Sequence, residues 1–290
     1  MWPGNAPASP STGATGMTAN PSGTPPRRYW HELGTEAFAT PEAADWVAVL
    51  PLAATEQHGP HLPTGTDTLI GDGLIRKALD AMPDDLPAVI LPTLAIGKSD
   101  EHGNFPGTLS LSAETLLRML IDVGDSVARS GLSKLLIMSA HGGNNDVAAI
   151  AARELRHRHR MLVVATSWAR LGQPEGLFDE TEQRLGIHGG EIETALMLHL
   201  GPDLVHKDKA ADFISAAQEM EQEFSVLRGT GRIGIAWLTE DLNRQGACGN
   251  AAAADAEKGR RSADHAVGRF VTLLKDMRRF DKARIGGAGN

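Results

Sequence analysis

The sequence contains a single cysteine, Cys248, so no disulfide can form within the chain. A chain without disulfides suits a reducing compartment, and we therefore expect a cytoplasmic protein. The sequence also lacks an apolar run long enough to cross a bilayer, so no membrane partner is expected. Basic residues number 28 against 36 acidic ones, which gives a formal net charge of −8, and no broad basic patch is present. This balance argues against nucleic acid as the main partner.

Large apolar side chains are almost absent from the first 26 residues, which are mainly Pro, Gly, Ser, Thr and Ala. Such a segment cannot bury enough surface to offset the entropy lost on ordering, so residues 1–27 are predicted to form a disordered tail. The segment also lacks the basic start and apolar centre of a secretory signal. Residues 28–285 are long enough for one large α/β domain.

What the chain does contain is an alternation of short apolar runs and longer helical patterns. The apolar runs are predicted as buried strands at residues 46–52, 88–94, 134–140, 161–168 and 232–238. The helical patterns lie at residues 68–82, 112–131, 145–158, 193–200 and 251–280. Strands that are apolar throughout and separated by helices indicate a mostly parallel sheet with both faces covered. We therefore predict an α/β fold, a three-layer α/β/α sandwich, with ligands bound beyond the carboxyl ends of the strands.

Polar side chains that can bind metal gather where these strands end. The stretch AATEQHGPHLPTGTD (53–67) follows the first predicted strand and carries Glu56, His58 and Asp67. Its glycines and prolines allow this loop to turn back on itself. The stretch SAHGGNND follows the third predicted strand in the same way and carries His141. Both loops therefore lie where a parallel sheet is expected to hold its ligand.

Two further stretches, GKSDEHGNFPGTLSL and IHGGEIET, bring more groups of the same kind. They contribute Ser99, Glu101, His102, His188, Glu191 and Glu193. Imidazole and carboxylate together suit zinc, manganese or iron. Because these groups are more than one ion needs, a pair of ions sharing a bridging carboxylate fits better; such ions lie about 3.5–4 Å apart and hold a water of lowered pKa. Spacing alone does not decide between Glu191 and Glu193.

Several of these stretches resemble segments of one known family. ATEQHGPHLPTGTD, SAHGGNN and HGGEIETALML resemble, in order, the three metal-binding segments of the creatininase (creatinine amidohydrolase) family. FPGTLSL (105–111) and GACGNAAAADAEKG (246–259) also resemble family segments. The similarity covers roughly residues 32–280. The first segment is long and specific, so it carries most of the resemblance.

The resemblance implies both a fold and a metal centre. The family has a three-layer α/β fold, binds two divalent ions per subunit, commonly zinc, manganese or iron, and forms closed homo-oligomers, often hexamers. Carried onto this chain, the family's ligands are Glu56, His58, Asp67, His141 and Glu193. Glu56 and His141 would hold one ion, His58 and Glu193 would hold the other, and Asp67 would bridge the two.

The resemblance also implies roles beside the substrate. His188 would stand next to the substrate and move a proton. The family's carboxylate directly precedes Thr, five residues after this histidine, which selects Glu193 from the two candidates. Ser99 matches a substrate-contact position only loosely, because that loop varies within the family. His102 and Trp168 are further candidates for lining the substrate pocket.

The chain departs from the creatinine-hydrolysing enzyme at the positions that grip the substrate. In that enzyme Tyr and Glu follow the histidine that matches His141, whereas here Gly142 and Gly143 follow it. That enzyme also has Trp and Asp, which close over the flat substrate ring, where this chain has Arg184 and Leu185. The residues that bind the metal are the same in both proteins, whereas the residues that bind the substrate differ. We therefore expect an amide hydrolase whose substrate is not creatinine.

Three functions from different classes stay open. The first is hydrolysis of a non-peptide C–N bond in a cyclic or small linear amide, a small-molecule substrate, by the hydroxide that bridges two metal ions. In that reaction His188 protonates the departing nitrogen. The second keeps the site but cleaves a peptide bond, as implied by the resemblance to a peptidase of mycofactocin maturation. The third is a non-catalytic metal-binding protein, which the presence of all five ligands disfavours.

Overall fold

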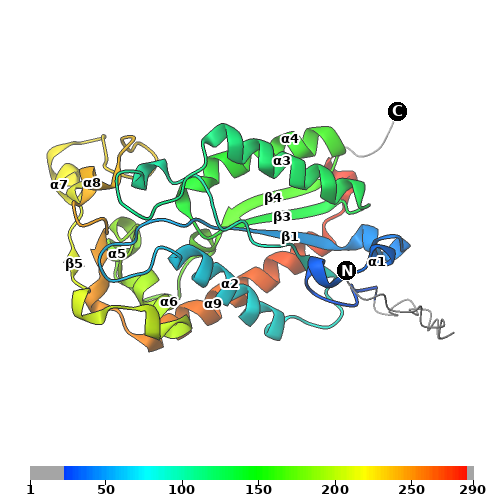
Figure 1. Ribbon diagram of the computed structural model, residues 1–290, viewed down its shortest axis with the longest axis horizontal. Coiled ribbons are helices and arrows are strands. Elements are labelled where there is room, and N and C mark those ends of the chain that lie inside the picture. The colour runs from blue at the N-terminus through cyan, green and yellow to red at the C-terminus, as the bar shows by residue number, and fades with distance from the viewer. Residues whose placement is uncertain (1–22, 286–290) are drawn as a thin grey trace, which may run out of the picture.

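The centre of the fold is a parallel sheet of four strands in the order β2-β1-β3-β4. The computed structural model describes residues 23–285 (Figure 1). The strands of the sheet are β1 (Val47–Leu52), β2 (Ala88–Ile90), β3 (Lys134–Ser139) and β4 (Leu162–Ser167). A second, antiparallel pair consists of β5 (Asp212–Phe213) and β6 (Gly249–Asn250).

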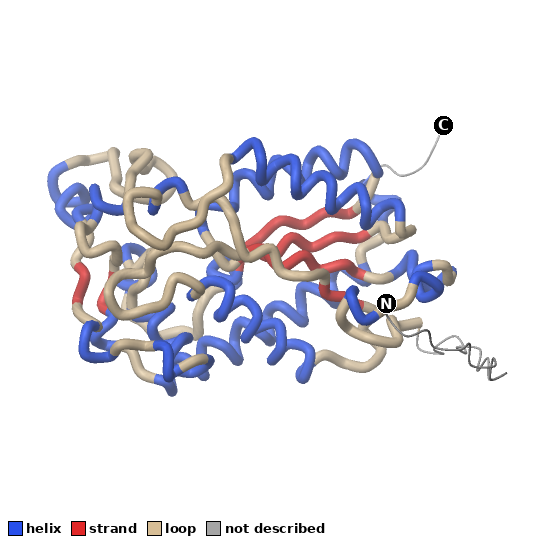
Figure 2. The backbone as a smooth tube through the Cα atoms, in the orientation of Figure 1, coloured by secondary structure: helices blue, strands red, loops and turns tan. Residues whose placement is uncertain are grey.

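Helices cover both faces of the central sheet (Figure 2). One face carries α2 (Thr66–Ala81), α6 (Glu191–Leu200) and α9 (Ala256–Arg279), and the other carries α3 (Ala113–Arg129) and α4 (Asn145–His159). The shorter helices are α1 (Thr35–Phe38), α5 (Glu180–Leu185), α7 (Ala216–Glu223) and α8 (Thr239–Leu242). The predicted three-layer α/β/α sandwich with a parallel sheet is thereby confirmed.

The sequence of β1 is apolar at every position because the strand is covered on both faces. Successive side chains of a strand point to opposite faces of the sheet. Val47 and Val49 pack into the core shared with α2, α6 and α9. Ala48, Leu50 and Leu52 pack into the core shared with α3 and α4. Both faces are buried, so no position of this strand can be polar without a cost in stability.

The ends of β1 and β3 place their loops side by side. Leu52, the last residue of β1, is paired with Ser139, the last residue of β3. The chain leaves both strands at the same edge of the sheet, and the segments that carry Glu56 and His141 begin there. The expectation that these loops meet follows from the parallel register alone.

Two predicted strands differ from the structure. The second strand ends at Ile90 instead of residue 94, because one extra residue interrupts its regular pairing with β1. The N–H groups of Leu91 and Leu94, three residues apart, donate to the carbonyls of Val49 (2.8 Å) and Pro51 (3.0 Å), which are only two residues apart. The predicted strand at 232–238 is wrong, since this segment forms a local turn. Arg228 donates its backbone N–H to the carbonyl of Ile233 (3.1 Å) and accepts from the N–H of Ile235 (3.0 Å).

The predicted tail, residues 1–27, lies mostly outside the described residues. In its described part, the carbonyl of Gly23 accepts a hydrogen bond from the indole N–H of Trp46 at 3.0 Å. Within residues 23–285, none of the helices combines the length and the apolar character that a bilayer crossing needs. Cys248 is buried and is a free thiol.

Candidate metal centre

The loop after β1 turns sharply before α2 begins. Gly59 has φ +69°, a left-handed conformation that glycine adopts without strain, and its N–H donates to the side-chain oxygen of Gln57 at 2.9 Å. The backbone N–H of Glu56 donates to the carbonyl of Thr64 at 2.9 Å, which closes the loop. Asp67 therefore follows in the first turn of α2, where the helix dipole favours a carboxylate.

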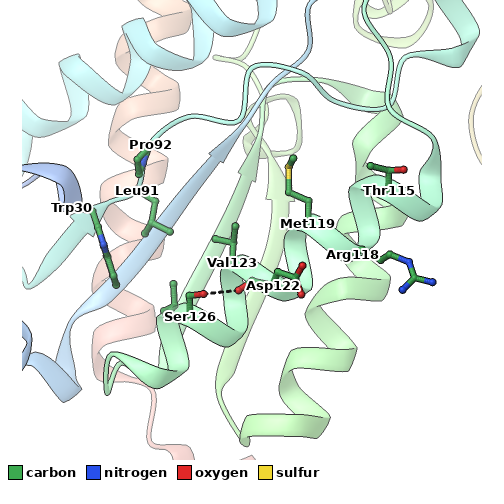
Figure 3. A pocket seen from close by; sticks show the side chains of 10 residues that line it. Trp30, Leu91, Pro92, Thr115, Arg118, Met119, Asp122, Val123 and Ser126 are labelled. Carbon is green, nitrogen blue, oxygen red and sulfur yellow. Dashed lines mark hydrogen bonds between the residues drawn. The ribbon is translucent and has the colours of Figure 1, made fainter.

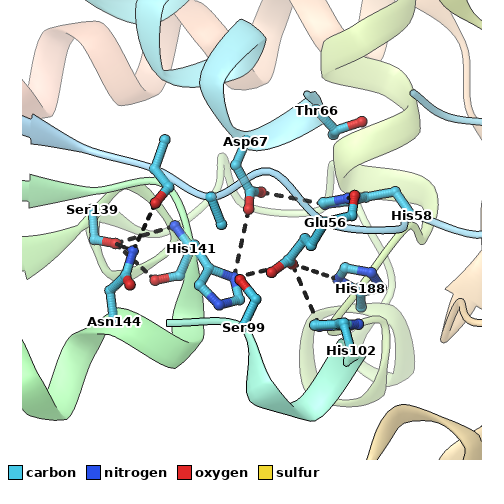
Figure 4. Close-up of polar contacts among 12 residues, drawn as sticks. Glu56, His58, Thr66, Asp67, Ser99, His102, Ser139, His141, Asn144 and His188 are labelled. Atoms are coloured by element: carbon cyan, nitrogen blue, oxygen red, sulfur yellow. Dashed lines mark hydrogen bonds and ion pairs between the residues drawn. The ribbon is translucent and has the colours of Figure 1, made fainter. Parts of the chain in front are cut away.

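The five predicted ligands converge on one small region. Figure 4 shows four of them, Glu56, His58, Asp67 and His141. Asp67 lies in the middle, with Oδ1 3.3 Å from Nε2 of His58 and Oδ2 3.5 Å from Nδ1 of His141. Glu56 Oε1 lies 3.1 Å from the same nitrogen of His141. On the other side, Glu193 Oε2 lies 3.9 Å from Nε2 of His58. Asp67 thus lies between His58, which is next to Glu193, and His141, which is next to Glu56.

Hydrogen bonds at the outer nitrogens fix the orientation of two of the imidazoles. Nδ1 of His58 faces the carbonyl of Glu56 at 3.1 Å, and Nε2 of His141 faces the carbonyl of Lys98 at 2.9 Å. A carbonyl can only accept, so each of these nitrogens carries a proton. The inner nitrogens, Nε2 of His58 and Nδ1 of His141, face the carboxylates and would present their lone pairs to a bound cation. Metal-binding histidines use this arrangement.

His188 and His102 approach the cluster from the other side of Glu56. Nδ1 of His188 and Nε2 of His102 lie 3.6 Å and 3.4 Å from Glu56 Oε1. Nε2 of His188 donates to the carbonyl of Gln57 at 2.6 Å. Nδ1 of His102 lies 2.8 Å from the hydroxyl of Thr239 in α8. The two rings are 4.1 Å apart, centroid to centroid, so they form one wall of the site.

Several buried polar atoms of the cluster have no hydrogen-bond partner. In the part of the chain that the structure describes, they include both carboxylate oxygens of Glu56, Oδ2 of Asp67 and Nε2 of His58. Glu56 is fully buried, and His58 and Asp67 are 1% and 2% exposed. Leaving one such group unsatisfied costs about 1–3 kcal/mol, and native proteins rarely tolerate it without a reason. Divalent cations would satisfy all of these atoms, so the residues fit a metal centre.

The ligand atoms are also close enough together to share ions. Among the described residues, three sets of metal-capable side chains have ligand atoms within 4.8 Å of one another. The sets are Glu56 with His102 and His188, His58 with His188 and Glu193, and Glu56 with His58 and Asp67. The sequence analysis assigned His188 and His102 to the substrate. The structure places their ring nitrogens within 4.8 Å of ligand atoms of the predicted metal ligands. Glu191 points elsewhere and forms an ion pair with Lys258.

Without a cation, burial and neighbouring charges shift the titration of the cluster strongly. Burial lowers the pKa of His58, but the carboxylates of Asp67 and Glu193 outweigh it and raise the pKa to about 10. Burial raises the pKa of Glu193 to about 7 and also raises the pKa of Asp67. For Glu56, burial acts in the same direction, but three histidines led by His141 outweigh it and lower the pKa. A cation bound here takes the place of the proton on His58.

Ser99 and Trp168 lie at the margins of the cluster. Ser99 is fully buried, and its hydroxyl is a further polar atom without a hydrogen-bond partner among residues 23–285. Trp168 is 7% exposed and packs on Phe270 with ring centroids 4.9 Å apart. Together with Glu193 it lines a cavity of about 310 Å³. The larger groove beside α3, of about 660 Å³ and lined by Trp30 and others, shares no residue with the cluster (Figure 3).

Sequence reasoning left the role of Glu101 undecided and missed that of Glu182. Glu101 Oε1 lies 3.3 Å from Nε2 of His141, the nitrogen that points away from the cluster, and Glu101 also pairs with Lys98 at 3.0 Å. Glu182 accepts the backbone N–H of Glu191, the first residue of α6, at 2.6 Å. Neither contact has a sequence signal, because each joins segments that meet only in the folded chain.

These observations define a class: an α/β protein with a buried carboxylate–imidazole centre at the carboxyl edge of its parallel sheet. The family model described as "Creatininase: Creatinine amidohydrolase" matches residues 31–274. The chain belongs to the creatininase family of hydrolases, as its sequence segments indicated.

Relatives and solved structures agree with this membership. The chain is 32% identical over 179 residues to the mycofactocin precursor peptide peptidase of Mycolicibacterium smegmatis, which covers 61% of this chain and 67% of that protein. It is 33% identical over 186 residues to the creatinine amidohydrolase of Pseudomonas putida, covering 59% and 70%. A solved structure described as "Creatininase Mn" superposes with a TM-score of 0.71 at 25% identity, covering 87% of this chain and 99% of that one. A mutant creatininase of "Zn-Zn type" gives 0.71 at 26% identity, covering 87% and 98%.

Proposed function

We propose that this chain is a metal-dependent amidohydrolase that cleaves an amide C–N bond other than that of creatinine. The observation that carries the proposal is the buried set of unpartnered carboxylate oxygens and inward-facing imidazole nitrogens. Glu56 and His141 would hold one divalent ion, His58 and Glu193 would hold a second, and Asp67 would contact both. Zinc, manganese and iron all suit such ligands.

Two divalent ions at this position supply Lewis acidity and a water of lowered pKa. The chain's own residues supply the rest. Because the cluster is buried, bulk water is excluded and each charge acts more strongly than it would in solvent. His188 donates at Nε2 to Gln57, so its Nδ1 is free to take up a proton and pass it to the departing nitrogen. In the metal-free chain, burial together with the charge of His58 lowers the pKa of His188 well below its ordinary value.

Creatinine does not suit the walls of this site. In the creatinine-hydrolysing enzyme a Trp-Asp pair closes over the flat ring, but here the guanidinium of Arg184 forms an ion pair with Glu221. Gly142 and Gly143 offer no side chain where that enzyme has Tyr and Glu. A small-molecule amide, cyclic or linear, is the substrate class that we propose for this chain.

A peptide bond is the second candidate, and a specific observation favours it. Proteins named mycofactocin precursor peptide peptidase are 32% and 34% identical to this chain over 179 and 184 residues. The same centre can attack either bond, because a peptide bond is itself an amide. Rates with a panel of small cyclic amides, linear amides and short peptides separate the two candidates. Metal-loaded protein without activity on any of them would favour a non-catalytic binding protein.

The bridging role of Asp67 gives the most direct test. We expect Asp67→Ala to lose at least one of two bound ions per subunit and nearly all activity, because both ligand sets lose a shared oxygen. Asp80→Ala is the matched control, since Asp80 lies on the same helix with an exposed side chain. Elemental analysis of the purified proteins by mass spectrometry measures the metal content. If the Asp67 variant keeps two ions and full activity, the proposed centre is wrong.

A further inference from the structure

The metal centre has one partly exposed member. The side chain of Glu193 is 25% exposed, whereas those of Glu56, His58 and Asp67 are 0–2% exposed and that of His141 is 6% exposed. A substrate has to approach through a surface that solvent can reach. In the described part of the chain, the side of the cluster that Glu193 forms is therefore the way in.

Glu193 lines a cavity whose other walls are mainly apolar. The cavity of about 310 Å³ lies between α2, α6 and α9 and the end of β4. Ile70 and Leu74 from α2, Leu196 from α6 and Trp168 after β4 contribute its apolar walls. The volume is at the lower end of the range found for small-molecule sites, about 300–1,000 Å³. It suits one side group rather than a whole extended ligand.

Two polar side chains that line the cavity already form hydrogen bonds within the protein. The hydroxyl of Ser262 donates to the side-chain oxygen of Gln173 at 2.7 Å. The side-chain amide of Gln183 donates to the carbonyl of Phe178 at 3.0 Å. Apart from Glu193, none of the described residues that line the cavity has an ionisable side chain. A charged group placed here would lose its hydration without gaining a partner, so the occupant has to be neutral and largely apolar.

We propose that this cavity is a specificity pocket, and that the chain acts on amides that carry an aliphatic or aromatic group next to the scissile bond. The inference rests on the proposed function, because it places the amide at the metal centre and its side group beyond Glu193. A leucine- or phenylalanine-like group fills the cavity, whereas a hydrogen atom or a carboxylate does not. Burying such a group raises affinity by roughly tenfold to a hundredfold.

Binding of uncharged amides tests the pocket without requiring hydrolysis. We expect N-acetyl-leucinamide and N-acetylphenylalaninamide to bind at least tenfold more tightly than N-acetylglycinamide, in ligand-observed NMR titrations of the full chain with and without zinc. N-acetyl-aspartamide, which carries a carboxylate, should bind no better than the glycine compound. Equal affinities across the series, or preference for the charged compound, would overturn the inference.

Ala169 provides a variant at the rim of the cavity. Its side chain is exposed and lines the cavity, so Ala169→Phe should narrow the pocket without disturbing the core. We expect this variant to lose the preference for the leucine compound. Arg170→Ala is the control, because Arg170 is the next residue, is exposed, and does not line the cavity. An unchanged preference in Ala169→Phe, or the same loss in the control, contradicts the assignment.

A second variant changes the size of the cavity in the opposite direction. Melting temperatures and hydrolysis rates then distinguish a folding defect from a failure of either proposal. Leu196→Ala enlarges the cavity and should shift the preference from the leucine compound toward the phenylalanine compound by about tenfold or less. Melting temperatures identify any variant that does not fold. Metal-loaded protein that keeps the binding preference but hydrolyses no amide overturns the proposed function and leaves the pocket in place. Protein that hydrolyses all amides equally overturns the pocket alone.

Discussion

At the scale of single residues, the two glycines after His141 differ in what surrounds them. A Cβ atom added to Gly143 would lie 2.0 Å from Oε1 of Glu101 and 2.5 Å from Nε2 of His141. One added to Gly142 would have no atom of the described residues within 4 Å. The carboxylate of Glu101 thus occupies the space beside Gly143. In this position the carboxylate lies 3.3 Å from Nε2 of His141, and the absence of a side chain at Gly143 leaves room for it.

Gly143→Ala is expected to weaken metal binding, because the added methyl group displaces Glu101 and rotates His141. Loss of the partner that orients a metal-binding histidine typically lowers affinity by about ten- to a hundredfold. Competition with a chromogenic chelator measures the affinity. Gly142→Ala is the control and should bind metal like the unchanged chain. Equal affinities in both variants would show that Glu101 does not position His141.

At the scale of elements, α6 depends on a carboxylate outside it. Glu182 is 4% exposed and accepts two backbone N–H groups, from Glu191 at 2.6 Å and from Asn250 at 2.9 Å. Cβ atoms added to Gly186 or Gly190 would lie 2.1 Å and 2.4 Å from its Oε1, so these glycines let the backbone close around it. Glu182 therefore holds in place the segment that brings His188 and Glu193 to the site.

Glu182→Gln is expected to destabilise the fold by about 1–3 kcal/mol, because the amide that replaces one oxygen cannot accept both N–H groups. The midpoint of urea unfolding measures the loss. Glu180→Gln is the control, since Glu180 lies in the same short helix with an exposed side chain. If both variants unfold at the same urea concentration, Glu182 does not stabilise the fold in this way.

The elements of the central sheet could be predicted from the sequence, whereas the contacts between distant segments could not. The runs at β1 and β3 are apolar at nearly every position because both faces of the sheet are covered, and that pattern is visible in the sequence. The position of Glu56 and His141 then follows from the parallel register. The contacts of Glu101 with His141 and of Glu182 with Asn250 join residues that are far apart in the sequence. No local sequence pattern therefore predicts the roles of these two carboxylates.

The wrong prediction at residues 232–238 has a different cause. Ile233 and Ile235 are apolar, but they are 56% and 36% exposed in the folded chain. An apolar pattern indicates that a segment avoids water. It does not indicate whether the segment is covered by its own chain or by another molecule. The backbone between Gly231 and Gly234 closes a local turn, and Gly234 pairs with Arg228 in an isolated bridge instead of a strand.

At the scale of the whole molecule, exposed apolar side chains gather at one end. The segment 214–238, which includes α7 and lies beside α8, carries many of them (Figure 1). They include Ile214, Phe224, Val226, Leu227, Ile233, Ile235 and Leu238, which are between 36% and 63% exposed. Soluble monomers rarely expose so many large apolar side chains in one region, and such regions commonly bind other proteins.

We expect this surface to join copies of the chain into a homo-oligomer, as the resemblance to the family implied. Sedimentation velocity should give the unchanged chain a mass of at least twice the 30.8 kDa of one chain. The double variant Val226→Asp, Ile233→Asp should sediment as a monomer, because two charges would be buried without partners. Ile150→Asp is the control, since Ile150 is 54% exposed on α4 and should leave assembly intact. Thr239 holds His102 beside this surface, so assembly would also stiffen one wall of the metal centre. A monomeric unchanged chain at micromolar concentration contradicts this expectation.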